Sequence, residues 1–243
     1  MLIINADDWG GWEKATDAAL ACQRAGRITS VTAMVFMKDS ERAAELAIKH
    51  GLDVGLHLNL NQSYSGMVLD GEKRKNHERL VRFLSRNKYS QLLYNPFLRK
   101  CFRTDYTAQL EEFQRLYGKA PSHIDGHQHK HLCANMLVDR VIGKGQKVRR
   151  NFSFWPGEKS LLNRTYRRLV DQWLARTYRL VDYFFSLEQC LKSKRLGRVA
   201  ELARIANVEL MTHPEKTPEY NFLMGEDFLQ FTQGLRLIPY ANF

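Results

Sequence analysis

Histidines and one aspartate are concentrated in a segment that holds four of the eight histidines of the chain, His123-Ile124-Asp125-Gly126-His127-Gln128-His129-Lys130-His131. Its histidines and aspartate all have the same parity, and alternate side chains of an extended strand point to one face. Neutral imidazole binds zinc, iron, copper and nickel, and two histidines with one carboxylate are a frequent ligand set. The segment therefore predicts a metal site, although a solvated, histidine-rich surface loop would show the same pattern.

Two acidic residues, Asp7 and Asp8, follow the short apolar run Leu2–Ala6. We expect this run to be a buried strand, and two carboxylates at its end are costly to bury unless a positive group pairs with them. A metal ion would be a suitable partner. An exposed acidic turn or a cap for the next helix is the alternative.

Two other predicted strands carry polar groups at comparable positions. Apolar and polar residues alternate in Asp53–Leu60, so His57 and Asn59 lie on one face, and His213 follows the apolar segment Val208–Thr212. A single histidine in a strand can be a satisfied core residue, and His-Pro can be a plain turn. The joint pattern is more specific, because the carboxyl ends of parallel strands meet at one edge of a sheet.

The rest of the chain predicts an alternation of strands and helices. Further strands are predicted at Ser30–Phe36, Lys147–Phe152, Leu180–Phe185 and Leu235–Pro239, and in the histidine segment. Helices are predicted at Trp12–Ala25, Ser40–His50, His77–Leu84, Asn95 to Gly118, Leu132–Gly143, Ser160–Arg179, Leu191–Ala206 and Gly225–Gln233. About eight alternations indicate one α/β domain over residues 1–243, with mostly parallel strands in a closed or nearly closed barrel. The long polar excursion Asn61–Tyr94 is typical of a lid or binding loop.

The composition indicates a globular protein with an excess of basic residues. The 243 residues are 44% hydrophobic and 26% charged, as in globular proteins, and the net charge is +11. A basic excess favours polyanions, acidic membrane surfaces or anionic substrates. We expect solvated helix faces at Lys144–Arg150, Arg164–Arg179 and Lys192–Arg198, the alternative being contact with an anionic glycolipid or membrane surface. No nucleic-acid reading motif is found, so no nucleic-acid partner is predicted.

The cysteines predict a reducing compartment. Cys22, Cys101, Cys133 and Cys190 lie far apart without a Cys-x-x-Cys pair, so we expect free thiols in the cytoplasm. No apolar run approaches the roughly 20 residues of a membrane helix. The amino terminus lacks a basic region followed by a long apolar core, so no secretory signal is visible.

The predicted site would suit hydrolysis of an amide. One carboxylate and two histidines leave coordination positions open, and a bound metal polarises a carbonyl and lowers the pKa of water. A second carboxylate can accept a proton, and a further histidine can protonate the poor amine leaving group. Two alternatives stay open: a phosphoesterase with two metals about 3.5–4 Å apart, and a catalytically silent carbohydrate- or polyanion-binding protein.

Four motifs in order resemble the YdjC/ChbG-type carbohydrate deacetylases. They are Asn5-Ala6-Asp7-Asp8-Trp9-Gly10, Gly55-Leu56-His57-Leu58-Asn59, the histidine segment and Thr212-His213-Pro214. The resemblance runs on to the closing residues 234–240, so it covers nearly the whole chain. It implies a distorted (β/α) TIM-like barrel, a divalent metal (Mg²⁺ or Zn²⁺), removal of acetyl groups from N-acetylated sugars, and a homodimer. Trp9 departs from the phenylalanine usual in the family, so we expect a repacked pocket wall.

The resemblance also implies roles for single residues. Asp8, His57 and His127 would bind the metal, and Asp7 would be the base, with the division between Asp7 and Asp8 left open. His213 would be the general acid or would stabilise the transition state. Substrate binding or support of the metal ligands is implied for four other residues, Asp125, His129, His131 and Asn59.

Overall fold

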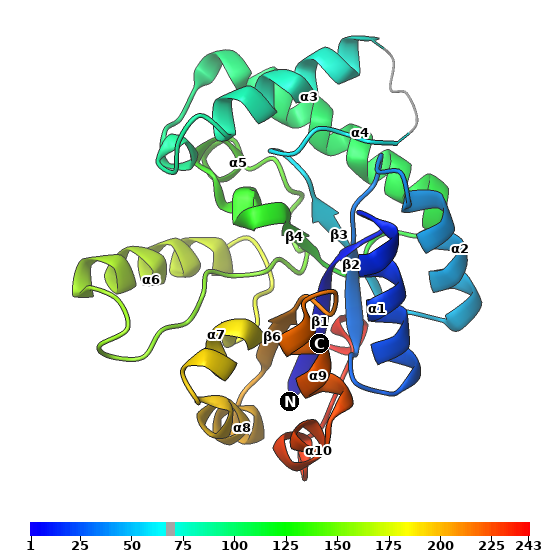
Figure 1. Ribbon diagram of the computed structural model, residues 1–243. Coiled ribbons are helices and arrows are strands. Elements are labelled where there is room, and N and C mark those ends of the chain that lie inside the picture. Colours follow the sequence, from blue (N-terminus) through cyan, green and yellow to red (C-terminus); the bar gives the residue numbers. More distant parts are fainter. Residues whose placement is uncertain (67–70) are drawn as a thin grey trace.

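Six parallel strands form the centre of the protein in the computed structural model, which describes residues 1–66 and 71–243. The strands are β1 (Leu2–Trp9), β2 (Ser30–Ala33), β3 (Val54–Leu58), β4 (Ile124–Gly126), β5 (Tyr183–Ser186) and β6 (Val208–Thr212). They pair in the order β4-β3-β2-β1-β6-β5 (Figure 1). The sheet curls into a half-barrel, which confirms the predicted α/β fold resembling a distorted TIM-like barrel. Within the described residues it has six regular strands where eight were expected, and β4 and β5 are edge strands, so the prediction of a closed or nearly closed barrel was wrong.

Strand β1 lies in the middle of the sheet and is buried along its whole length. A central parallel strand is covered on both faces, so its sequence is a continuous apolar run and does not alternate. Leu2, Ile3 and Ile4 are each 0% exposed. The run therefore delivers Asp7 and Asp8 directly to the carboxyl edge of the sheet.

Helices surround the sheet (Figure 1). They are α1 (Glu13–Arg24), α2 (Ser40–His50), α3 (Gly71–Leu84), α4 (Arg99–Tyr117), α5 (Ala134–Val138), α6 (Leu161–Ala175), α7 (Leu187–Lys192), α8 (Leu196–Ile205), α9 (Thr217–Met224) and α10 (Glu226–Thr232). The short 3₁₀ helices are η1 (Ser90–Leu92), η2 (Pro96–Leu98), η3 (His127–Leu132) and η4 (Tyr240–Asn242). Helices α2 and α4 end at Gly51 and Gly118, whose φ angles of 63° and 65° suit the left-handed position after a helix.

Two predicted strands are wrong as regular strands. Lys147–Phe152 and Leu235–Pro239 make only isolated bridges, of which Val148 with Ile124 and Leu237 with Leu2 lie beside the sheet. After Val148 the backbone carbonyl of Arg149 meets the His131 ring instead of a neighbouring strand. Pro239 has no N–H with which to extend a ladder.

Several predicted helices differ in length. Leu132–Gly143 is reduced to α5, and Leu191–Ala206 is divided between α7 and α8 around Lys194, whose φ is 53°. Helix α9 was not predicted, and α3 begins before the predicted His77. Residues 67–70 of the predicted lid lie outside the described residues. Among those described, no helix is both long enough and apolar enough to cross a membrane.

Candidate active site

The carboxyl ends of four strands converge on one site. In the parallel register His57 of β3 lies beside Asp125 of β4, and Ala6 of β1 lies beside Thr212 of β6. Strand β1 is irregular between Ala6 and Trp9, and Asp8 has a φ of 64°. Aspartate tolerates this left-handed conformation better than most residues, and such an irregularity re-aims side chains. The two adjacent aspartates can therefore serve different partners.

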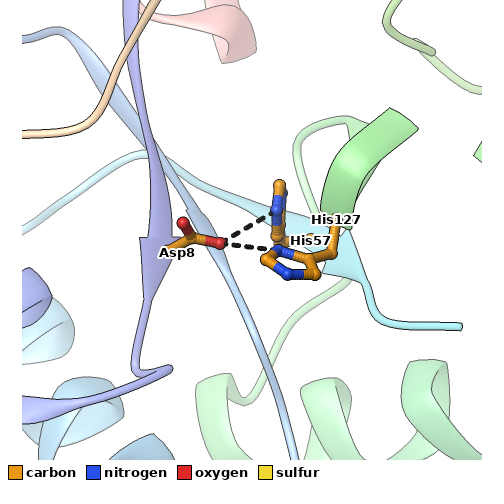
Figure 2. A group of neighbouring side chains, drawn as sticks. All are labelled: Asp8, His57 and His127. Atoms are coloured by element: carbon orange, nitrogen blue, oxygen red, sulfur yellow. Dashed lines mark hydrogen bonds and ion pairs between the residues drawn. The ribbon is translucent and has the colours of Figure 1, made fainter. Parts of the chain in front are cut away.

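The Asp8 carboxylate faces two histidine rings, as Figure 2 shows. Its Oδ1 lies 3.2 Å from His57 Nε2 and 3.0 Å from His127 Nδ1. Burial opposes ionisation of Asp8, but the hydrogen bonds to His127 and His57 hold its pKa well below the usual value. Asp8 and His57 are buried, whereas the His127 side chain is 14% exposed. The group is thus closed on the protein side and open toward solvent at His127.

These three residues fit a divalent cation. One atom from each lies within 4.8 Å of the other two, a separation that an ion between them can bridge. The opposite ring nitrogen of His57, Nδ1, lies 2.7 Å from Asp125 Oδ1. A carboxylate in this position orients a ligating histidine and makes it more basic. Burial lowers the pKa of His57, but the charge and hydrogen bond of Asp125 outweigh it and raise that pKa well above its usual value.

A second cluster, Asp7, His57 and Asp125, is also compact enough for an ion. Here, however, the Arg149 guanidinium already provides the positive charge. Its Nη1 lies 2.7 Å from Asp7 Oδ2 and 2.6 Å from Asp125 Oδ2. A metal ion at this position would meet a fixed cation, so the geometry favours Asp8 over Asp7 as the carboxylate ligand.

Arg149 was missed by the sequence analysis, which expected Lys144–Arg150 to be a solvated helix face. The segment is not helical and the Arg149 side chain is 0% exposed, so that expectation was wrong. Its third carboxylate partner is Glu209, whose Oε1 lies 2.7 Å from Nη2. Burial disfavours the charged guanidinium, but the three carboxylates raise the pKa of Arg149 well above its usual value. The need of the buried Asp7 for a positive partner could have indicated a buried arginine, but we considered only a metal ion for that role.

His213 approaches the same aspartate from β6. Its Nε2 lies 3.8 Å from Asp8 Oδ2, and its side chain is 18% exposed. On the other side Nδ1 lies 3.7 Å from Oε1 of the buried Glu219, a residue of the unpredicted helix α9. The second oxygen of Glu219 accepts hydrogen bonds of 2.9 Å from the His213 backbone N–H and from Thr212 Oγ1. Burial lowers the pKa of His213, but Glu219 and the two aspartates raise it above the usual value.

The histidine segment does not continue as a strand, so its histidines do not share one face. After Gly126 the chain turns, with positive φ angles of 49° at Gln128 and 58° at His129. His131 is buried beneath the site, with Nε2 2.9 Å from the Arg149 carbonyl oxygen. Of the three histidines in 127–131, His127 alone makes an ion pair with Asp8 in the described part of the chain.

Two of the other predicted site residues, Asp125 and Asn59, lie deeper than a substrate contact requires. Asp125 and Asn59 are each 0% exposed, and Asn59 donates a hydrogen bond to the Gln62 carbonyl oxygen. His129 is half-buried, with its ring edge-on to Phe152 at 4.5 Å between centroids. Trp9 is buried as well and donates its indole N–H to the Ala43 carbonyl oxygen of α2, at 3.2 Å.

Comparison with known proteins places the chain in a family. The profile of YdjC-like proteins matches residues 1–233. The chain belongs to the YdjC-like family. It is 28% identical to the carbohydrate deacetylase of Mus musculus over 88% of this chain and 77% of that protein. It is 31% identical to the chitooligosaccharide deacetylase of Proteus mirabilis over 54% of this chain and 50% of that protein.

The fold of this YdjC-like chain also has a counterpart among solved structures. A crystal structure from Enterococcus faecalis V583, of a protein named for cellobiose-phosphate cleavage, superposes with a TM-score of 0.67. The superposition covers 99% of this chain and 97% of that one at 19% identity. At this identity the likeness shows the fold alone.

Proposed function

We propose that this protein is a metal-dependent hydrolase that removes N-acetyl groups from an amino sugar, an oligosaccharide or a glycoconjugate. The observation that carries the proposal is the convergence of Asp8, His57 and His127 on one point, within a chain of the YdjC-like family. The relatives named carbohydrate and chitooligosaccharide deacetylases indicate the substrate class.

The proposed mechanism divides the work between the two aspartates. Asp8, His57 and His127 would hold the cation. When bound, a divalent cation supplies Lewis acidity, which polarises a carbonyl and lowers the pKa of water. Asp7 would accept a proton from the attacking water while the oxygen of that water bonds to the acetyl carbon. Arg149 would hold the Asp7 carboxylate in position for this step.

His213 would complete the reaction by protonating the amine. The bond between the acetyl carbon and the nitrogen breaks, and the nitrogen receives the proton from the ring, so acetate and a free amine leave. Glu219 would hold the ring in place. We propose that Asp125, His131 and Asn59 support the site from below, and that His129 lines the substrate side.

The remaining parts of the proposal follow from the family resemblance and from ligand chemistry. Mg²⁺ and Zn²⁺ are the candidate ions, and two imidazoles favour Zn²⁺. We further propose one deacetylase domain over residues 1–243, a homodimer and a cytoplasmic location. The four cysteines are free and buried, as expected of a reducing compartment.

Acetate release tests the proposal. Purified protein would be assayed with N-acetylated oligosaccharides and glycolipids, with chelator and after return of Mg²⁺, Zn²⁺, Mn²⁺ or Co²⁺. We expect release that depends on the metal, at one ion per chain. Asp8→Asn should lose metal and turnover together, Asp7→Asn should keep the metal and lose turnover, and the exposed Asp17→Asn is the matched control. Turnover in Asp8→Asn equal to that of the control would refute the assignment, and two ions per chain with phosphate release would favour a phosphoesterase.

A further inference from the structure

We propose that a surface formed by residues 89–97 and helix α6 docks on an anionic phospholipid membrane. This docking surface lies apart from the metal ligands, and the proposal does not depend on the proposed function. In Figure 1, α6 projects from the left side of the molecule, and the segment between α3 and α4 lies above it on that side.

The docking surface gathers most of the exposed large apolar side chains. Of the fifteen in the described part of the chain, five lie in 89–97 and four in α6. They are Tyr89, Leu92, Leu93, Tyr94, Phe97, Leu161, Leu162, Tyr166 and Leu169. Phe97 is 85% exposed and Leu162 is 84% exposed. Single exposed apolar residues are ordinary, but such a concentration marks an interaction surface.

Helix α6 combines these apolar side chains with positive charge. Leu162, Tyr166 and Leu169 recur at spacings of four and three and so form one stripe. Arginines lie along the same helix, and its one acid, Asp171, is buried and paired with Arg150 at 2.8 Å. The exposed part of α6 therefore carries cations and apolar groups without a compensating anion. Basic amphipathic helices of this kind lie on membrane surfaces.

The region around 89–97 has the same character. Arg79, Arg82 and Arg86 line a groove together with Asn95 and Leu98. The spacing of three and four residues aligns the three arginines on one side of α3 and its extension. Among the described residues, no hydrogen bond or ion pair is found for the side chain of any of the three. Three unpaired guanidinium groups beside exposed aromatic and leucine side chains suit a layer of phosphate groups above acyl chains.

Both parts of the docking surface are hydrogen-bonded to segments that carry residues of the candidate site. Lys130, which follows His129, donates a hydrogen bond from Nζ to Gln91 Oε1 at 3.2 Å. Asp171 of α6 accepts hydrogen bonds from the backbone and side chain of Asn151, at 3.0 and 2.9 Å. Docking would therefore act on segments that adjoin the site.

Charge decides between a membrane and a second copy of this chain. Two copies joined symmetrically through α6 would bring arginines against arginines, because a twofold interface uses the same surface on both partners. With a net charge of +11, the whole molecule is attracted to an anionic surface. An anionic bilayer satisfies both the charge and the apolar stripe.

Vesicle flotation of the full-length protein tests the proposal. The protein would be mixed with vesicles of phosphatidylcholine alone or with added phosphatidylglycerol. We expect binding to the anionic vesicles that is about tenfold tighter and is weakened by salt. The triple variant Arg79→Gln, Arg82→Gln, Arg86→Gln should lose about tenfold in affinity, because each removed charge weakens attraction to the lipid surface.

A matched pair of variants tests the apolar stripe. Leu162→Ser should weaken binding about threefold or more, since its side chain would enter the interfacial region. Ile205→Ser is the control, because Ile205 is also 84% exposed but lies in α8. Equal binding of the two variants, or equal binding to neutral and anionic vesicles, would overturn the proposal. Self-association that Leu162→Ser abolishes, without vesicle binding by the wild type, would instead identify a second copy as the occupant.

Discussion

The Arg149 guanidinium forms a bidentate ion pair with Asp7, in which Nη1 lies 2.7 Å from Oδ2 and Nη2 lies 2.7 Å from Oδ1. Neither side chain is more than 3% exposed. Because of this ion pair, the two aspartates adjacent in the sequence have different partners. Asp7 faces a fixed cation of the protein, and Asp8 faces two histidine rings that can share a metal ion.

Replacing Arg149 should destabilise the protein strongly. Arg149→Met leaves Asp7, Asp125 and Glu209 buried without their cation, and breaking such a buried pair typically costs about 3–5 kcal/mol. Arg149→Lys should cost less, because it keeps the charge but loses the planar fork. Urea unfolding would measure both variants, with exposed Arg204→Met as the control. A loss below about 1 kcal/mol for Arg149→Met would show that the carboxylates are not held by this residue.

Asp125 should set the metal affinity without touching the ion. Its Oδ1 lies 2.7 Å from His57 Nδ1, and removal of such a partner usually weakens metal binding about 10–100-fold. We expect Asp125→Asn to show this loss for Zn²⁺ in isothermal titration calorimetry at neutral pH. Exposed Asp17→Asn should bind as the wild type does. Unchanged affinity in Asp125→Asn, with the fold verified by circular dichroism, would mean that His57 needs no such orientation.

Glu209 should make stability depend on pH. Burial raises its pKa from 4.5 to about 7, although Arg149 and Tyr240 oppose the shift. Because the folded pKa is the higher one, the stabilisation is fully present below pH 4.5 and is lost as the pH rises to about 7. A shift of this size corresponds to about 3 kcal/mol.

Glu209→Gln removes this titration. Between pH 4.5 and 7 the unfolding free energy of the wild type should fall relative to that of the variant, as denaturant titrations at several pH values would show. Parallel pH curves for the two proteins would mean that Glu209 stays ionised in the folded state, held by Arg149.

Gly55 should not tolerate a side chain. A Cβ at this position would lie 2.5 Å from the ring of the buried His123 and 2.8 Å from its carbonyl oxygen. We expect Gly55→Ala to cost about 1–3 kcal/mol, because the backbone of β3 must move away from β4. Gly197 in α8 is the control, since nothing lies within 4 Å of its added Cβ. Gly197→Ala should stabilise the protein by about 0.5–1 kcal/mol in thermal unfolding.

The elements near the amino terminus were predicted well because their signals are local. The apolar run of β1, the helical spacing of α2 and the alternation in β3 each specify one kind of element, and glycine marks the end of α2. Prediction failed where tertiary contacts replaced a regular element. After Gly126 the histidine segment leaves the strand, and a Cβ at Gly126 would lie 2.9 Å from the His131 backbone nitrogen.

By itself, the sequence determined which reactive side chains are available and at which edge of the sheet they lie. Asp8, His57, His127 and His213 each end or follow a strand, and parallel strands direct such ends to one edge. The tertiary structure alone decided the partners of these residues. Asp7 and Arg149 are 142 residues apart, and Asp125 and His57 are 68 apart. Such pairs produce no periodic pattern in the sequence. A buried charge needs a partner of opposite sign, and only the folded chain decides which residue lies close enough to be that partner.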